Sequence, residues 1–470
     1  MVGTEPVAAN GRSVAAAAAA DHGSKGFKLV GASNFKRHNP RSDLFPMHKF
    51  DHVEFWCGDA TTTSGRFGFG LGMTLVAKSD QSTGNHHFAS YVMQSGDLVM
   101  AFTAPYSSKT DKSESRPPVE YDQDEAYDFL KTHGLAVRAF GILVDDAAEA
   151  YHMSTANGGI GVRTPVTLTD EATGQTCTYA EVKLYGDCVL RFVSGSYEGP
   201  FLPGWQAVED APHVSYGLER LDHAVGNVPE LIPQVEYMAK AFGFHEFAEF
   251  TADDVGTVDS GLNSMVMANN NEITLLCLMR TFVMANNNEM ILLPVNEPTF
   301  GTKRKSQIQT YLEQNEGPGL QHVALKTDDI FSTMRKMRAV SRLGGFDFVP
   351  APSEQYYREL PKKMGNLLTQ QQYKEVEELG LLVDKDDQGV LLQIFTKPVG
   401  DRPTVFFEII ERLCTLPPPA EVPLGDGEEL PRSRRKRVPT EVGGCGGFGK
   451  GNFGELFKSL EAYETELGIN

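Results

Sequence analysis

The stretch Val390–Arg412 reads VLLQIFTKPVGDRPTVFFEIIER and predicts an antiparallel β-hairpin. Two segments rich in β-branched and aromatic residues, Val390–Phe395 and Thr404–Ile410, flank a turn at residues 397–403 that contains two prolines and a glycine. This pattern places Glu408 inside the second strand, with apolar neighbours on both sides.

Glu408 shares one strand face with Phe406 and Ile410, because side chains alternate along a strand. Burying a carboxylate is unfavourable unless it is paired, hydrogen-bonded or bound to a cation. For this stretch alone, a salt-bridged core glutamate is the simpler interpretation. Histidines elsewhere in the chain favour a bound cation instead.

Length and composition are those of a globular protein that does not bind nucleic acid or span a membrane. The chain has 470 residues, enough for two or three domains, with 41% hydrophobic and 22% charged residues. Its net charge of −19 argues against general nucleic-acid binding. We find no transmembrane run and no secretory signal. The six cysteines form no CxxC pair, which predicts a reduced protein without a disulfide or zinc framework.

Internal repeats organise the chain. The sequence FDHV at Phe50–Val53 returns as LDHA at Leu221–Ala224 and as LQHV at Leu320–Val323. A weaker copy, Val137–Asp146, parallels the segment from Leu320 and places Ala139 where that segment has His322. These repeats predict four βαβββ units, two in each half of the chain. The pattern resembles the vicinal-oxygen-chelate (glyoxalase-like) fold, an α+β architecture in which paired units form half-open barrels.

The expected domains follow from these repeats and from composition. A disordered tail at 1–26 precedes an N-terminal barrel domain without metal at 27–212 and a catalytic barrel domain at 213–414. A linker at 415–442 leads to a C-terminal lid helix within 443–470, where apolar residues from Phe453 to Tyr463 recur at helical spacing.

Two repeated histidines and Glu408 predict a metal site in the second half. His223 and His322 lie at equivalent positions on the first strands of two units, and Glu408 lies on the last strand of the second unit. Two imidazoles and one carboxylate match the facial triad of non-haem Fe(II) oxygenases. The first half has His52 and Ala139 at the corresponding positions, and its closing strand carries no acid.

From Gly26 onwards the chain resembles the 4-hydroxyphenylpyruvate dioxygenase family, in its plant form. The resemblance is carried by the segments Phe55–Ala60, Arg220–Val228, Gly301–Thr310, Leu391–Pro398 and Gly446–Phe453. It implies one Fe(II) per chain, held by His223, His322 and Glu408. It further implies conversion of 4-hydroxyphenylpyruvate and O2 to homogentisate and CO2, in tyrosine catabolism and in the supply of plastoquinone and tocopherol precursors.

The resemblance also implies a substrate pocket. The residues expected to act in catalysis are Gln307, Gln321, Gln393, Phe395 and Asn452. Those expected to bind substrate are Ser264, Asn296, Phe406, Phe448, Phe453 and Phe457. Flat aromatic walls can position a ring, and amides donate and accept hydrogen bonds without adding charge beside a metal. As alternatives, Phe406 and Phe457 are plain core residues, and Gln321 only satisfies backbone groups.

The chain departs from the family in one segment. VMANNNE at Val266–Glu272 recurs at Val283–Glu289, an offset of 17 residues. We expect the second copy to fill the strand that leads to Asn296, so that residues 266–282 protrude and displace Ser264. A catalytically impaired scaffold is therefore one alternative function, and a 4-hydroxymandelate synthase-like enzyme is another. The family further suggests a cytoplasmic homodimer, with a plastid location as the alternative.

Overall fold

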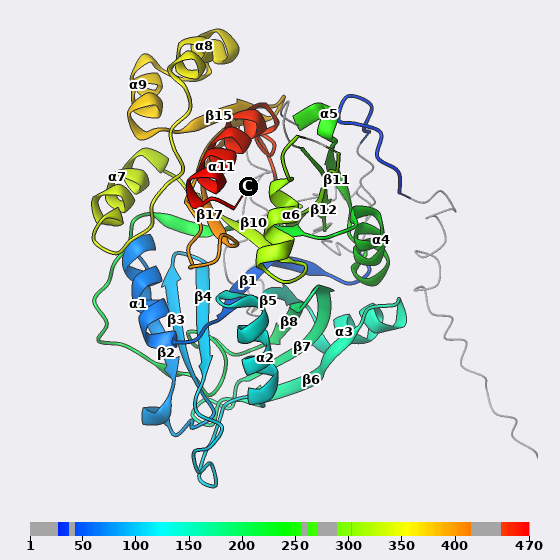
Figure 1. Ribbon diagram of the computed structural model, residues 1–470. Helices are drawn as coiled ribbons and strands as arrows, with labels where there is room; N and C mark the ends of the chain where they lie inside the picture. The colour runs from blue at the N-terminus through cyan, green and yellow to red at the C-terminus, as the bar shows by residue number, and fades with distance from the viewer. Residues whose placement is uncertain are drawn as a thin grey trace, which may run out of the picture.

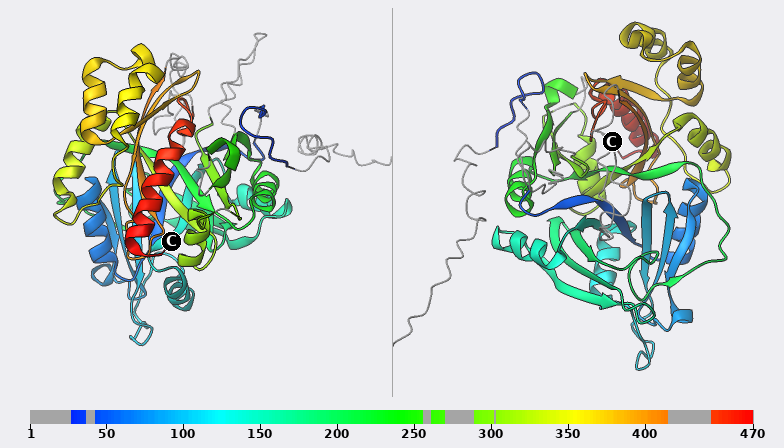
Figure 2. Two further views of the ribbon diagram at one scale, coloured as in Figure 1. Left: turned by 45° about the horizontal axis from the view of Figure 1, so that its top comes forward. Right: turned by 180° about the vertical axis from the view of Figure 1, so that it is seen from behind.

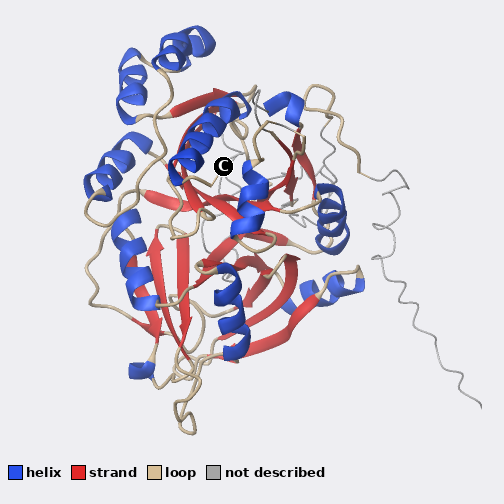
Figure 3. Cartoon of the chain, viewed as in Figure 1, coloured by secondary structure: helices blue, strands red, loops and turns tan. Residues whose placement is uncertain are grey.

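The computed structural model describes residues 27–36, 43–255, 261–269, 289–301, 303–414 and 443–469. The expected tail at 1–26 and linker at 415–442 lie outside these ranges. Two curled sheets make up the body of the chain, one from each half, and Figures 1 and 3 show them with helices around them. Within the described ranges, no helix combines the length and apolar character needed to cross a membrane.

The first sheet has nine strands in the order β6-β7-β8-β5-β1-β4-β3-β2-β9. Its first unit consists of β1 (Met47–Trp56), α1 (Ala60–Leu71), β2 (Thr74–Ser79), β3 (Phe88–Ser95) and β4 (Leu98–Pro105). After α2 (Gln123–His133) come β5 (Ala136–Val144), α3 (Ala147–Ala156), β6 (Gly161–Thr169), β7 (Thr176–Tyr185) and β8 (Cys188–Gly195). A short strand, β9 (Gln206–Ala207), ends the sheet.

The second sheet has eight strands in the order β11-β12-β13-β10-β14-β17-β16-β15. Its first unit consists of β10 (Leu218–Asn227), α4 (Leu231–Phe242), β11 (His245–Phe250), α5 (Ala252–Val255), β12 (Leu262–Ala268) and β13 (Leu292–Pro298). After α6 (Gln307–Gln314) come β14 (Gly319–Thr327), α7 (Ile330–Ser341), α8 (Glu354–Met364), α9 (Gln370–Leu379), β15 (Leu382–Lys385), β16 (Gly389–Phe395) and β17 (Phe406–Cys414). The helix α11 (Phe453–Leu467) ends the described chain.

The four predicted βαβββ units are confirmed by the strand pairing. In each unit the first strand runs parallel to the last, as β1 does with β4 and β14 does with β17. The two units of each sheet meet through their first strands, which pair antiparallel as β1 with β5 and β10 with β14. The sheets share a core, because the ring of Phe55 on β1 lies 6.4 Å, between centroids, from that of Phe407 on β17. Figure 2 shows the two sheets against each other from two further directions.

Aspartates begin three of the four crossover helices. The carboxylate of Asp59 accepts the backbone N–H of Thr62 at the start of α1, and Asp146 and Asp329 cap α3 and α7 in the same way. Such caps satisfy backbone donors that have no partner inside the helix. At the start of α4 the N–H of Leu231 donates instead to the side chain of Glu297 on β13.

The predicted hairpin at Val390–Arg412 is confirmed as β16 and β17, although the second strand begins at Phe406 rather than at Thr404. Phe395 lies opposite Glu408 in its register. The predicted C-terminal helix is also present and extends to Leu467, four residues beyond the predicted end at Tyr463.

The expected placement of the duplicated segment is wrong. The first copy, not the second, continues the strand from Ser264, and Val266–Ala268 are the last residues of β12. Asn269 of the first copy closes the strand pair through hydrogen bonds with Ile291, and Glu289 of the second copy lies 2.6 Å from His245. The first copy therefore supplies the end of β12, and of the second copy the structure describes only Glu289, which precedes β13. Residues 270–288 lie outside the described ranges.

A disulfide also contradicts the sequence analysis. Cys414 at the end of β17 is bonded to Cys445 in the segment before α11, 31 positions further along the sequence. A CxxC search cannot detect such a pair, because the chain brings the two thiols together only in three dimensions. Of the cysteines in the described ranges, Cys57, Cys177 and Cys188 are buried and take part in no disulfide.

Candidate metal centre and active-site cavity

Three side chains converge inside the second sheet. His223 on β10 lies opposite Ala324 of β14, and Ala324 lies beside Glu408 of β17. His322, two residues before Ala324 on β14, points to the same face because strand side chains alternate. The Nε2 atoms of His223 and His322 are 3.1 Å and 3.4 Å from Oε2 of Glu408. These three residues are buried and form the one group in the described ranges whose ligand atoms could hold a metal ion.

The second nitrogen of each imidazole has its own partner. Nδ1 of His223 lies 2.9 Å from Oδ1 of Asp222, and Nδ1 of His322 lies 3.0 Å from Oε1 of Gln321. An oxygen acceptor at Nδ1 holds the proton there and leaves the Nε2 lone pair free for a metal. The donor set and its supporting contacts therefore fit a divalent ion such as Fe(II).

The charges of the three groups are coupled. Burial raises the pKa of Glu408, but the two imidazoles outweigh that effect and lower it to about 2. Burial lowers the pKa of His223, yet Glu408 and Asp222 raise it above its ordinary value overall. For His322 burial dominates and lowers the pKa. The site thus presents an anionic carboxylate, which attracts a cation.

An ion pair behind His223 joins the site to the C-terminal segment. The guanidinium of Arg412 lies 2.7 Å from Oδ1 of Asp222, and both side chains are 1% exposed. Burial raises the pKa of Asp222, but Arg412 and the hydrogen bond with His223 hold it well below its usual range. Arg412 also donates to the backbone carbonyls of Cys445 and Gly447, each at 2.7 Å.

A cavity opens beside the three side chains. Ten of the eleven side chains expected in catalysis or substrate binding line it, together with the metal ligands: Ser264, Asn296, Gln307, Gln321, Gln393, Phe395, Phe406, Phe448, Phe453 and Phe457. The duplication has not displaced Ser264, which is 3% exposed and lies opposite Asn296 in the β12–β13 register.

Asn452 lies just behind this lining. Its side chain is fully buried and its Oδ1 accepts a hydrogen bond from the hydroxyl of Tyr356. Gly449, three residues earlier, has φ +71, and a Cβ there would collide with the amide of Gln393. Glycine is therefore needed where the segment approaches the cavity. The amide oxygen of Gln393 is buried without a hydrogen-bond partner in the described ranges.

Apolar residues that the sequence analysis did not select complete the walls: Val225, Phe250, Leu262, Val266, Pro294, Leu456 and Leu460. Leu456 and Leu460 belong to the apolar stripe of α11, so that helix covers the cavity. The period of the stripe could have identified them. The others are single apolar residues on buried strands and carry no sequence signal of their own.

Comparisons with known proteins identify the family. The 4-hydroxyphenylpyruvate dioxygenase of Arabidopsis thaliana is 53% identical over 455 residues, and the alignment covers 94% of each chain. That of Plectranthus scutellarioides is 54% identical over 447 residues, again covering 94% of each. The chain belongs to the 4-hydroxyphenylpyruvate dioxygenase family. It is therefore an oxidoreductase.

The fold of this family member is the expected vicinal-oxygen-chelate fold. A solved triple mutant of 4-hydroxymandelate synthase from Streptomyces coelicolor superimposes with a TM-score of 0.66 at 20% identity, covering 89% of this chain and 99% of that one. No family model matches the chain.

Proposed function

We propose that the chain converts 4-hydroxyphenylpyruvate and O2 to homogentisate and CO2, using one Fe(II) held by His223, His322 and Glu408. The observation that carries this proposal is the convergence of these three ligand atoms within 4.8 Å of one another beside the cavity. Plant relatives that carry the name of this activity are 51–54% identical to the chain.

His223, His322 and Glu408 would hold the Fe(II), and the bound ion would supply oxygen activation and a binding place for the 2-oxo acid group of the substrate. The ligand set of two imidazoles and one carboxylate favours Fe(II) over ions that prefer all-oxygen coordination.

The protein's own part is to orient the substrate ring and to exclude water. Phe395 on β16 and Phe453 at the start of α11 both line the cavity, so that a ring can lie between a strand and the covering helix. Phe406 stacks on the ring of His322 at 4.8 Å between centroids and fixes that ligand's orientation. The helix α11 closes the cavity, which keeps water from the reacting groups.

Neutral amides provide the polar contacts. Gln307, Gln393 and Asn296 come from three different elements and line the same cavity. Because these amides carry no charge, they can hold a phenol or a carboxylate without adding to the charge of the metal site. The buried, unpartnered oxygen of Gln393 is an acceptor suited to the hydroxyl of a phenol.

Product analysis tests the proposal. The full-length chain is loaded anaerobically with Fe(II) and then exposed to air and 4-hydroxyphenylpyruvate. The products are separated by chromatography and identified by mass spectrometry. We expect homogentisate. Hydroxymandelate, which forms from the same substrate by benzylic hydroxylation, would establish the alternative enzyme. Metal binding without product would establish an impaired scaffold.

A further inference from the structure

A second cavity lies in the first sheet, at the place that corresponds to the metal centre of the second. His52 on β1 lies opposite Gly141 of β5, and Gly141 lies beside Arg191 of β8. This row repeats the row of His223, Ala324 and Glu408. Arg191 therefore stands where the second sheet has its metal-binding carboxylate.

The guanidinium of Arg191 is itself the cation of this half. It lies 2.7 Å from Glu54 and 2.7 Å from Glu181, and it contacts Nε2 of His52 at 3.0 Å. Burial raises the pKa of Glu54, but Arg191 outweighs this and lowers it. The innermost charged groups are thus in direct contact with one another, so an ionic ligand would have to compete with these contacts as well as lose its hydration.

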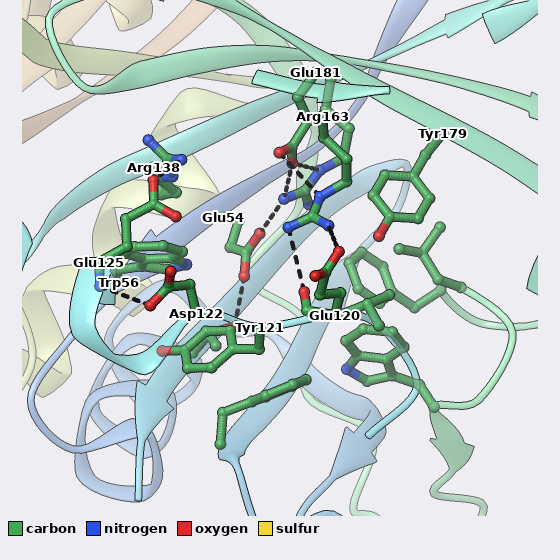
Figure 4. Close-up of a pocket in the computed structure, with 17 residues that line it drawn as sticks. Glu54, Trp56, Glu120, Tyr121, Asp122, Glu125, Arg138, Arg163, Tyr179 and Glu181 are labelled. Carbon is green, nitrogen blue, oxygen red and sulfur yellow. Dashed lines mark hydrogen bonds and ion pairs between the residues drawn. The ribbon is translucent and has the colours of Figure 1, made fainter. Parts of the chain in front are cut away.

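The walls of this cavity are aromatic. It is lined by six aromatic side chains: Trp56, Phe88, Tyr121, Tyr179, Phe201 and Trp205. Figure 4 shows Trp56, Tyr121 and Tyr179 around it, with Arg163 between Glu181 and Glu120. Arg163 pairs with both carboxylates, at 3.5 Å and 3.3 Å, and so its charge is also compensated.

Two polar groups in the lining have no hydrogen-bond partner among the described residues. They are the indole Nε1 of Trp205 and the hydroxyl of Tyr121. Trp205 is only 7% exposed. Burial raises the pKa of Tyr121, so its hydroxyl stays protonated. A buried polar group of this kind is normally satisfied by protein, water or ligand. An indole N–H can only donate, whereas a tyrosine hydroxyl can donate or accept.

We propose that this cavity binds a neutral aromatic molecule of about the size of phenol, bearing a hydroxyl or carbonyl oxygen. The oxygen accepts the N–H of Trp205 and exchanges a hydrogen bond with Tyr121, while the ring packs against the aromatic walls. This site is separate from the metal centre, since it lies in the other sheet and shares no lining residue with the cavity there.

The tryptophans provide a selective test. The chain has two, Trp56 and Trp205, and both line this cavity. The full-length protein is titrated with phenol, and tryptophan emission is excited at wavelengths where phenol does not absorb. We expect saturable quenching. Tyr121→Phe keeps both reporters and should weaken binding about fivefold, the change expected for one net hydrogen bond. Trp205→Phe should weaken phenol binding by a similar factor, measured through the emission of the remaining Trp56.

Matched controls separate this site from the metal centre. Phe395→Ala alters the other cavity and should leave the phenol titration unchanged. Quenching that is linear in phenol, and that Tyr121→Phe does not alter, would mean that the cavity holds water only and would overturn the proposal. If tetramethylammonium or benzoate changed the tryptophan emission saturably and with the same affinity as phenol, the proposal that the cavity binds only neutral ligands would be overturned. If Trp205→Phe does not fold, Tyr121→Phe decides the question alone.

Discussion

Arg412 and Asp222 form a buried ion pair, with Nη2 2.7 Å from Oδ1, directly behind His223, one of the three proposed metal ligands. Asp222 fixes the imidazole through Nδ1, and Arg412 binds the carbonyls of Cys445 and Gly447. One pair of side chains therefore connects the orientation of the His223 imidazole to the segment that leads into the covering helix α11.

We predict that Asp222→Asn weakens Fe(II) affinity about 10–100-fold, the usual effect of losing a supporting contact to a ligand histidine. It also leaves Arg412 buried without its counter-charge, which lowers the free energy of unfolding by about 3–5 kcal/mol. Anaerobic metal titration and urea unfolding measure the two effects. Asp51→Asn is the matched control, because Asp51 contacts Nδ1 of His52 at 2.8 Å in the first sheet. Equal metal affinity in both variants would refute the role of Asp222.

Metal affinity should rise with pH. The pKa of His223 is raised, because Glu408 and Asp222 outweigh the effect of burial. Fe(II) must displace the proton that this imidazole retains, so affinity is lowest below the raised pKa and levels off above it. The increase in Fe(II) affinity should continue above a pH of about 6.5, which is the ordinary pKa of histidine. Anaerobic titrations between about pH 6 and 8 test this. An affinity independent of pH over that range would contradict it.

Removing α11 should uncouple the reaction. A chain that ends at Asn452 keeps the contacts of Arg412 with Cys445 and Gly447, and so should keep its metal. It loses Phe453, Leu456, Phe457 and Leu460 from the cavity wall, which admits water and releases the ring. We expect more O2 consumed per homogentisate formed. A chain that lacks only residues 468–470 is the control, and normal coupling in the shorter chain would show that α11 is not a functional cover.

Deleting the duplication should raise soluble yield without changing turnover per folded molecule. Removal of residues 266–282 produces the same sequence as removal of 273–289, so either deletion leaves one intact copy of VMANNNE to continue the strand from Ser264. Ser264 already lies in the cavity, and a longer connection adds only about 1–2 kcal/mol of closure entropy. The segment Ile273–Met279 is uncharged and apolar, a composition typical of aggregation. Turnover per folded chain that rises severalfold on deletion would contradict this account.

The disulfide should stabilise the chain under oxidising conditions. Cys414→Ser combined with Cys445→Ser should lower the free energy of unfolding by about 2–4 kcal/mol, as for bonds that close loops of this length. Unfolding in urea with and without reductant measures the effect. Reductant should destabilise the parent chain and leave the double variant unchanged. Equal stability of all four samples would mean that the bond contributes nothing.

The repeats in the sequence are sufficient to predict the four units, and they also select the three side chains that the structure brings together as a candidate metal site. His223 and His322 recur at one position of the unit, and Glu408 is an acid on an otherwise apolar strand face. An alignment of the closing strands of the two halves also shows that Arg191 occupies the position equivalent to Glu408, and it thus identifies the altered site of the first half. Which copy of VMANNNE continues β12 could not be predicted, because the two copies are identical in sequence. Only the continuity of β12 from Ser264 distinguishes them.

Oxygen uptake in two variants tests the central claim most directly. Glu408→Ala removes the anionic ligand of the proposed iron site, whereas His52→Ala removes the corresponding histidine of the first sheet, which lies beside Arg191 rather than a metal. Each is supplied with Fe(II) and 4-hydroxyphenylpyruvate after its folding is verified by circular dichroism. We predict that uptake and homogentisate formation are lost in Glu408→Ala and retained in His52→Ala. Undiminished uptake by folded Glu408→Ala at ordinary iron concentrations would contradict the assignment of the site.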